Sequence, residues 1–153
     1  MKVAVLGANG QLGADVSREF TRKGDDVQEL SHSEIEICSL ESVRDVLRDA
    51  KPQIIANTAA MHRVESCEGE PLKAYEVNAL GARNLALVAR QIGAVLIHIS
   101  TDYADGPNEF TAKVPRPKYS VLENNALKVL GLNFFQTWED GLLSYLSSQQ
   151  HTN

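Results

Sequence analysis

The first hundred residues alternate short apolar runs with amphipathic segments, and this alternation limits the chain to one class of fold. The apolar runs have the length and uniform hydrophobicity of strands that are buried on both faces of a sheet. The segments between them repeat apolar residues three or four positions apart, as one face of a helix does. Strands and helices in this order form a parallel sheet with helices on both faces. The pattern predicts an α/β fold with a doubly wound sheet of about four strands.

Four apolar segments are expected to be strands, and they are residues 2–6, 27–30, 53–58 and 94–100. The expected helices run from Leu12 to a stop at Gly24, over residues 40–51, and over residues 72–92. Numbered along the chain, the strands are expected in the order 3-2-1-4. The strand at 94–100 then lies at an edge, where its open hydrogen-bonding groups invite a covering segment or a second copy of the chain.

A glycine-rich turn, G-A-N-G-Q-L-G at residues 7–13, joins the first strand to the first helix. Such a turn lets the backbone approach a pyrophosphate, and the following helix start offers N–H groups and the positive end of its dipole. The turn therefore predicts a Rossmann-like dinucleotide site with Ala8 and Asn9 at the tip. A tight turn with a purely structural role remains the alternative.

The end of the second strand carries Ser31 and His32, at the place where dinucleotide-binding folds choose between NAD and NADP. No acid stands there to exclude the extra phosphate of NADP, and no arginine stands there to bind it. The expected cofactor is therefore NADP or NAD, with the preference open. Both residues can also be ordinary loop residues.

The bulk properties fit one soluble domain. The chain has 153 residues, 43% of them hydrophobic, and a formal net charge of −5. Neither nucleic acid nor a membrane surface is expected as a partner of such a chain. Cys38 and Cys67 have no metal-ligand or disulfide spacing, so no metal site is expected. Because no leader or spanning segment is visible, the expected location is cytoplasmic.

The domain organisation is expected to change after Tyr103. Residues 1–103 carry the dinucleotide-binding βα units, and residues 104–119 are rich in turn formers, which predicts a loop. Residues 120–148 begin with a capping-box pattern and continue as C-terminal helices packed on the same domain. Residues 149–153 are expected to be a disordered end.

Five motifs in order resemble the dTDP-4-dehydrorhamnose reductase family of extended short-chain dehydrogenases. They are G-A-N-G-Q-L-G at 7–13, E-I at 36–37, N-T-A-A at 57–60, V-N at 77–78 and I-S-T-D-Y at 99–103. The spacing of the three glycines is the one associated with short-chain dehydrogenases, and the tail around Trp138 is also similar to the end of the family's chain. The resemblance implies a Rossmann-like fold, an NAD(P)H cofactor and a dTDP-linked 4-keto sugar as substrate.

The resemblance also assigns roles by position. It implies cofactor contacts along the glycine turn, at the second strand, beside the adenine, after the third strand and on the long helix. These residues are Gly7, Asn9, Gly10, Gln11, Leu12, Gly13, Ser31, Glu36, Ile37, Ala59, Ala60, Met61 and Asn78. Thr101 matches the family's catalytic hydroxyl, and Tyr103 is placed at the same catalytic mouth.

Two of these residues, and three other polar residues, have simpler explanations. Asn78 can satisfy a neighbouring backbone group, and Thr101 can cap a turn. His98 is expected to be a hydrogen-bonded core residue. His62 and Arg63 are expected to form an exposed basic pair, with a substrate phosphate as the alternative partner.

The Y-x-x-x-K pattern that supplies the proton in this family is absent. The residues four positions after the tyrosines are Ala79, Pro107, Glu123 and Gln149. The resemblance therefore implies a member whose central segment, between about residues 106 and 114, is deleted, with weak or no reductase turnover. The alternatives are a non-catalytic regulatory or scaffold protein, comparable to the regulatory subunit of methionine adenosyltransferase, and a folded remnant without function.

Overall fold

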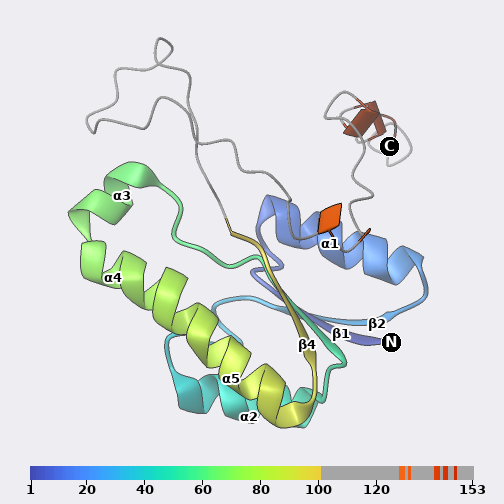
Figure 1. The fold of residues 1–153 in the computed structure, drawn as a ribbon, viewed down its shortest axis with the longest axis horizontal. Helices are drawn as coiled ribbons and strands as arrows, with labels where there is room; N and C mark the ends of the chain where they lie inside the picture. Colours follow the sequence, from blue (N-terminus) through green and yellow to red (C-terminus); the bar gives the residue numbers. More distant parts are fainter. Residues whose placement is uncertain (101–127, 130, 132–139, 142, 145–146, 148–153) are drawn as a thin grey trace.

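A computed structural model describes residues 1–100, 128–129, 131, 140–141, 143–144 and 147 of the chain. In this part, four parallel strands form one sheet in the order β2-β1-β3-β4 (Figure 1). They are β1 (Lys2–Leu6), β2 (Asp26–Leu30), β3 (Ile54–Asn57) and β4 (Val95–His98). The Rossmann-like α/β class expected from the sequence is confirmed. The expected loop at 104–119, most of the C-terminal helices, the 149–153 end, Thr101 and Tyr103 lie outside the described residues.

Helices cover both faces of the sheet, as Figure 1 shows. Helix α1 (Gln11–Arg22) packs on one face, where Val16 and Phe20 contact a cluster containing Val3 and Val5. Helices α2 (Leu40–Ala50) and α5 (Ala82–Ile92) pack on the other face. The long helix expected at 72–92 is built from α4 (Pro71–Tyr75), a π-helical segment η1 (Glu76–Gly81) and α5, and a short helix α3 (Val64–Gly69) precedes it. Among the described residues, no helix has the length and apolar character needed to cross a bilayer.

The core consists of two apolar layers separated by the sheet. Strand β1 lies between them, and Val3, Ala4, Val5 and Leu6 are fully buried. Alternate residues of a strand point to opposite faces, so Val3 and Val5 face α1 while Ala4 and Leu6 face α2 and α5. A strand with both faces covered must be apolar at every position, which explains the uniform sequence of β1.

The expected sheet order 3-2-1-4 is wrong, because β3 pairs with β1 and not with β2. Val3 stands opposite Ile54 and Leu6 opposite Asn57 in the parallel register. The chain after β2 forms turns instead of a strand over most of residues 31–39, so nothing in the described part extends the sheet beyond β2. Helix α2 then returns the chain to the far side of β1.

The turns after β2 are held by the core and by one buried amide. Ile35 and Ile37 are buried in the layer formed with α2 and α5. Asn84 on α5 is 5% exposed, and its Nδ2 donates hydrogen bonds to the carbonyl oxygens of Ile37, at 3.0 Å, and Cys38, at 3.2 Å. One side chain therefore supplies two backbone carbonyls of an irregular segment that has no strand partner.

Strand β4 forms an edge of the sheet in the part of the chain that the structure describes. It pairs with β3 alone, and Val95, Ile97 and Ile99 are 61%, 41% and 40% exposed. The expected edge position of this segment is thus confirmed for the described residues, although its neighbour is β3 and not β1. The expected covering by tail residues around Leu127 and Trp138 concerns positions outside the described residues.

Replacing Asn84 tests the role of this amide in holding the segment after β2. We expect Asn84→Ala to lower the free energy of unfolding by about 1–3 kcal/mol, because two carbonyl groups lose their hydrogen-bond donor. Urea denaturation followed by circular dichroism measures the change. The matched control is Arg83→Ala, at an exposed neighbouring position, which should change stability by less than about 0.5 kcal/mol. Equal effects of the two substitutions would contradict this role.

Candidate functional site

The glycine turn brings the end of β1 and the start of α1 into contact. Gly7 has φ +76°, and its N–H donates to the carbonyl oxygen of Leu30 on β2 at 2.9 Å. A Cβ on Gly13 would lie 2.2 Å from the carbonyl oxygen of Gly7, which no side chain can tolerate. A Cβ on Gly10 would lie 3.2 Å from the same atom, a tight contact. Gly7 and Gly13 therefore permit the conformation and close packing of the turn. Gly10, which has no side chain, leaves space above the outer surface of the turn.

The start of α1 is open to an anion. Gly10 precedes the helix without a side-chain hydrogen bond to it, and the first helical turn contains no acidic residue. The N–H groups and the positive end of the dipole at such a helix start favour a bound phosphate or carboxylate. This is the arrangement that the glycine turn predicts.

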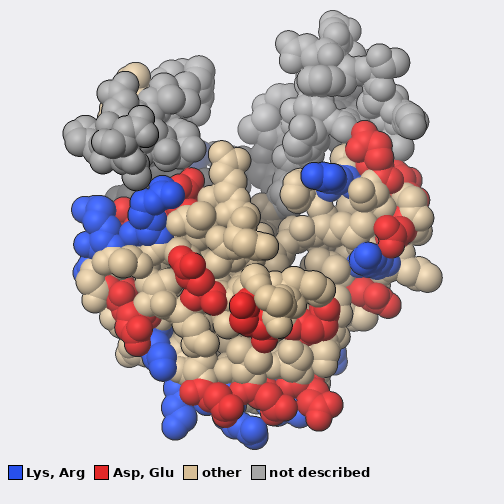
Figure 2. All heavy atoms as spheres, turned by 180° about the vertical axis from the view of Figure 1, so that it is seen from behind, with Lys and Arg blue, Asp and Glu red and all other residues tan. Residues whose placement is uncertain are grey.

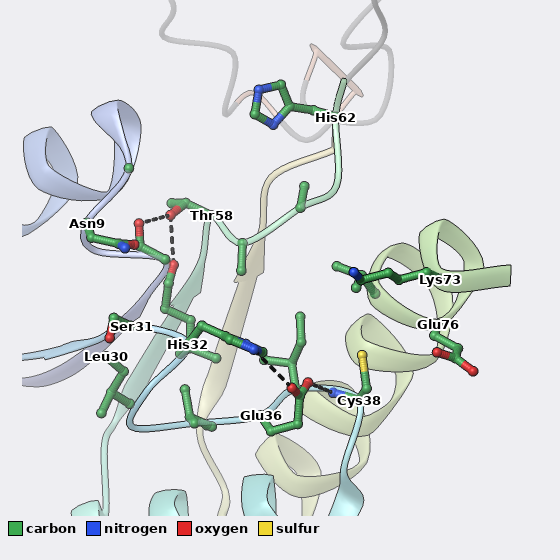
Figure 3. A pocket seen from close by; sticks show the side chains of 18 residues that line it. Asn9, Leu30, Ser31, His32, Glu36, Cys38, Thr58, His62, Lys73 and Glu76 are labelled. Carbon is green, nitrogen blue, oxygen red and sulfur yellow. Dashed lines mark hydrogen bonds and ion pairs between the residues drawn. The ribbon is translucent and has the colours of Figure 1, made fainter. Parts of the chain in front are cut away.

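A cleft of about 480 Å³ runs from this turn along the carboxyl ends of the strands (Figure 3). Its size lies within the range of small-molecule sites. The predicted site residues that line it are Gly7, Asn9, Gly10, Ser31, Glu36, Ile37, Ala59 and Ala60. Further lining residues that the motif analysis missed include Cys38, Thr58, Lys73 and Glu76. These four come from turns and helices whose distance to the glycine turn cannot be inferred from spacing along the chain.

Five predicted cofactor residues do not line the cleft, and they are Gln11, Leu12, Gly13, Met61 and Asn78. Asn78 holds the backbone of Met61 instead. Its Oδ1 accepts from the Met61 N–H at 2.9 Å, and its Nδ2 donates to the Met61 carbonyl at 2.8 Å. The structure thus shows the simpler backbone-holding role weighed for Asn78, and the cofactor contacts of these five residues stay predictions.

Side chains at the end of β3 fix the floor of the cleft. The Thr58 hydroxyl donates to the Leu6 carbonyl oxygen at 2.7 Å, which ties β3 to the end of β1 (Figure 3). Asn57 is buried, accepts from the Ala59 N–H at 3.1 Å and lies 2.9 Å from Nδ1 of His98. His98 is hydrogen-bonded as expected, but it is exposed and not a core residue, because β4 is an edge strand in the described part.

The opposite wall is a turn with an ordered carboxylate. Glu36 Oε1 accepts from the Cys38 N–H at 2.9 Å, and this hydrogen bond lowers the pKa of Glu36. His32 Nε2 lies 3.4 Å from Glu36 Oε2 at the mouth of the cleft (Figure 3). Burial, followed by the nearby Glu36 carboxylate, raises the pKa of Cys38 to about 11, so the thiol stays protonated near neutral pH.

The mouth of the cleft carries mixed charge. His62 lines it and is exposed, which agrees with the expected exposure of the His62-Arg63 pair. Lys73 also lines the cleft, and its Nζ lies 3.4 Å from Oε2 of Glu70. On the face seen in Figure 2, basic and acidic side chains lie next to one another. The described residues contain no cluster of three or more His, Cys, Asp or Glu side chains suited to a metal ion.

The chain is similar in sequence to a known protein family. The family model described as RmlD substrate binding domain matches residues 1–109. The chain belongs to this family. Members with related sequences include the spore coat polysaccharide biosynthesis protein SpsK of Bacillus subtilis, 42% identical over 102 residues, and the dTDP-4-dehydrorhamnose reductase of Streptomyces griseus, 37% identical over 99 residues. The resemblance expected from the motifs is therefore confirmed.

The relatives of this RmlD family member are longer proteins. The matches cover 67% and 65% of this chain but only 36% of SpsK and 33% of the Streptomyces reductase. A crystal structure of dTDP-4-dehydrorhamnose reductase from Bacillus anthracis in complex with NADP is similar, with a TM-score of 0.64 and 35% identity, over 71% of this chain and 39% of that chain. The chain thus spans about a third of the length of these curated relatives, and its match lies in the part with the glycine turn.

Two glycine substitutions separate the fold of the turn from its outer surface. We expect Gly13→Ala to destabilise the protein by about 1–3 kcal/mol or more, because the new methyl overlaps the Gly7 carbonyl. Gly10→Ala should leave the fold intact, since Gly10 has φ −81° and a looser contact. Thermal denaturation measures both. Gly69→Ala, where nothing lies within 4 Å of the new methyl, is the control and should cause little destabilisation. A Gly13→Ala protein as stable as this control would refute the close packing.

Proposed function

We propose that this chain is a dinucleotide-binding module of the dTDP-4-dehydrorhamnose reductase type and that it binds NADP or NAD in the cleft beside the glycine turn. One observation carries the proposal: Gly10, which immediately precedes the open start of α1, lines a cleft that also reaches the end of β2 and the wall at Glu36. A dinucleotide needs these three elements, for its pyrophosphate, its ribose and its adenine.

The residues present fit such a group. The Gly10 surface and the start of α1 would hold the pyrophosphate, and Ser31 would lie beside the adenosine ribose. Glu36 and Ile37 would border the adenine, with the Cys38 thiol neutral at the same wall. Ala59 and Ala60 would line the rest of the cofactor beyond Thr58. When bound, the reduced nicotinamide would supply a hydride to a carbonyl group.

Turnover of a nucleotide-linked 4-keto sugar is proposed to be weak or absent. Carbonyl reduction needs a proton donor, and no tyrosine of this sequence is followed by lysine at the fourth position. The catalytic roles proposed for Thr101 and Tyr103 rest on the family resemblance alone. A dTDP-sugar remains the proposed substrate class, and the cytoplasm remains the proposed location.

The second candidate function is non-catalytic. The same missing tyrosine and lysine pair favours a nucleotide-binding regulatory or scaffold protein, which would need the cleft but no proton donor. This candidate predicts a stoichiometric protein partner and dinucleotide binding without any sugar reduction.

Titration with NADH and NADPH tests the proposed site. We expect saturable binding of at least one dinucleotide by isothermal titration calorimetry, and a loss of at least about tenfold in affinity for Gly10→Val, because the larger side chain occupies the outer surface of the turn. Binding should also raise the melting temperature of the unmodified chain by mass action. Absence of binding to both dinucleotides would reject the proposal.

A rate measurement separates the two candidate functions. With dTDP-4-dehydro-6-deoxy-L-mannose and NADPH, we expect oxidation at least about 10²-fold slower than for a reductase that has the proton donor. A rate within tenfold of such a reductase would overturn the proposed weakness of turnover. Dinucleotide binding with no detectable oxidation, together with a stoichiometric partner in pull-down, would favour the regulatory function.

The exposed edge at β4 supports self-association. In the described part, β4 pairs with β3 alone, and the alternate side chains of Val95, Ile97 and, just after the strand, Ile99 are exposed on one face beside this open edge. We propose a homodimer formed through this edge. Sedimentation velocity over a dilution series should show a dimer that Ile97→Lys converts to a monomer, while dinucleotide binding stays unchanged. A wild-type chain that is monomeric at every concentration would contradict the dimer.

A further inference from the structure

The tip of β2 carries an acidic side chain that the linear sequence does not place there. Glu34 follows β2 by four residues, but the turn after Ser31 brings it back. The N–H groups of Glu34 and Ile35 both donate to the Ser31 carbonyl oxygen at 3.1 Å. Ile35 is buried in the core at 3% exposure, so this turn is anchored from below.

The Glu34 carboxylate is hydrogen-bonded to Ser31 twice. Its Oε2 accepts from the Ser31 backbone N–H at 2.7 Å and from the Ser31 hydroxyl. Ser31 itself lines the cleft. Glu34 is exposed and does not itself line the cleft, but its carboxylate lies directly against Ser31, the cleft residue at the end of β2.

Hydrogen-bond donors at this tip are already engaged. Both donors of Ser31 point to Glu34, so its hydroxyl oxygen can only accept. It accepts from the hydroxyl of Ser33, at 2.7 Å, and from the Ser33 N–H, at 3.3 Å. A phosphate, which has acceptor oxygens only when fully ionised, finds no free donor on Ser31 or on these two groups of Ser33.

The charged groups nearby also disfavour a phosphate. Glu36 is a second carboxylate on the same wall, and the one basic group found beside it, His32, is exposed and paired with Glu36 at 3.4 Å. The two hydrogen bonds from Ser31 lower the pKa of Glu34, which keeps it ionised at neutral pH. The described residues around the end of β2 therefore present a net negative, acceptor-rich surface.

We propose that Glu34, held by Ser31 at the end of β2, makes this chain bind NAD(H) in preference to NADP(H). The inference rests on the proposed dinucleotide site and adds its specificity-determining residue. A ribose hydroxyl is a donor and can hydrogen-bond to the carboxylate at this place in the fold, whereas a 2′-phosphate is repelled by it. A dianion within a few ångströms of a carboxylate in water loses about tenfold in affinity through this repulsion alone.

Parallel titrations of four proteins with NADH and NADPH test the inference. The proteins are the wild-type chain, Glu34→Gln, Ser31→Ala and Glu41→Gln, each measured by calorimetry at low and at 0.5 M salt. We expect the wild type to bind NADH about tenfold more tightly than NADPH. Glu34→Gln keeps the shape of the side chain and removes its charge, so it should narrow this ratio several-fold, mainly through tighter NADPH binding. Added salt should narrow the wild-type ratio in the same direction.

Glu41→Gln is the matched control, and Ser31→Ala is a second test variant. Glu41→Gln removes the same charge from an exposed position in the first turn of α2, outside the cleft lining, and should keep the wild-type ratio. Ser31→Ala removes the hydroxyl that anchors Glu34 while leaving the carboxylate, and should weaken the discrimination partly. Ser31→Ala also tests the inference if Glu34→Gln destabilises the protein. Thermal denaturation measures the stability of each variant.

The outcomes distinguish this inference from the proposed function. Equal affinity of the wild type for the two dinucleotides, or tighter NADPH binding, overturns the preference while leaving the dinucleotide site intact. An unchanged ratio in both Glu34→Gln and Ser31→Ala overturns the assignment to Glu34. Failure of both dinucleotides to bind the wild type overturns the site and the preference together.

Discussion

The contact between the start of α1 and the end of β1 is the constraint on which the site depends. Gly13 lies so close to the carbonyl oxygen of Gly7 that no side chain fits between them. This contact holds the start of α1 against the turn, and Gly10, which immediately precedes α1, lines the cleft. A larger residue at Gly13 would overlap the Gly7 carbonyl and so disturb the turn that forms this side of the cleft.

The wall opposite this turn depends on the core instead of on a ladder of strand hydrogen bonds. The segment after β2 forms no strand over 31–39, yet Ile35 and Ile37 are buried and Asn84 supplies two of its carbonyl groups. These anchors fix a segment whose upper side chains, Ser31 and Glu36, line the cleft. The burial of Ile35 and Ile37 in the core thus determines where Ser31 and Glu36 lie in the cleft wall.

The sequence was sufficient to predict the fold class but not which strands pair with one another in the sheet. Short apolar runs indicated the four strands, and the pattern is clearest in β1 and β3, whose residues are largely buried. Periodicity carries no information on which strand pairs with which, so the expected order failed where β3 pairs with β1 and not with β2. His98 was expected in the core for the same reason, since its strand is apolar but lies at an edge of the described sheet.

Within the site, glycines were predictable and polar contacts were not. Gly7 and Gly10 follow from local geometry, and both line the cleft. Glu34 was missed because its position depends on a turn, although Ser31-x-x-Glu34 has the spacing of a capping box and was a usable signal. Asn78 was matched by motif, and its amide is hydrogen-bonded to the Met61 backbone, so a motif position also has a role in the fold that the motif does not reveal.

The proposed binding site and the missing proton-donor pair concern different features of this chain. The residues that line the cleft all lie between Leu6 and Val77 in the sequence. Contacts within the described segment 1–100 fix their positions. The proton donor for carbonyl reduction in this family is a tyrosine with a lysine four positions later, and no tyrosine of this sequence is followed by lysine at that position. Since the binding walls do not depend on that pair, loss of turnover need not weaken dinucleotide affinity. Selection for a bound dinucleotide alone would therefore preserve the glycine turn, Ser31 and Glu36 while leaving the catalytic positions free to change.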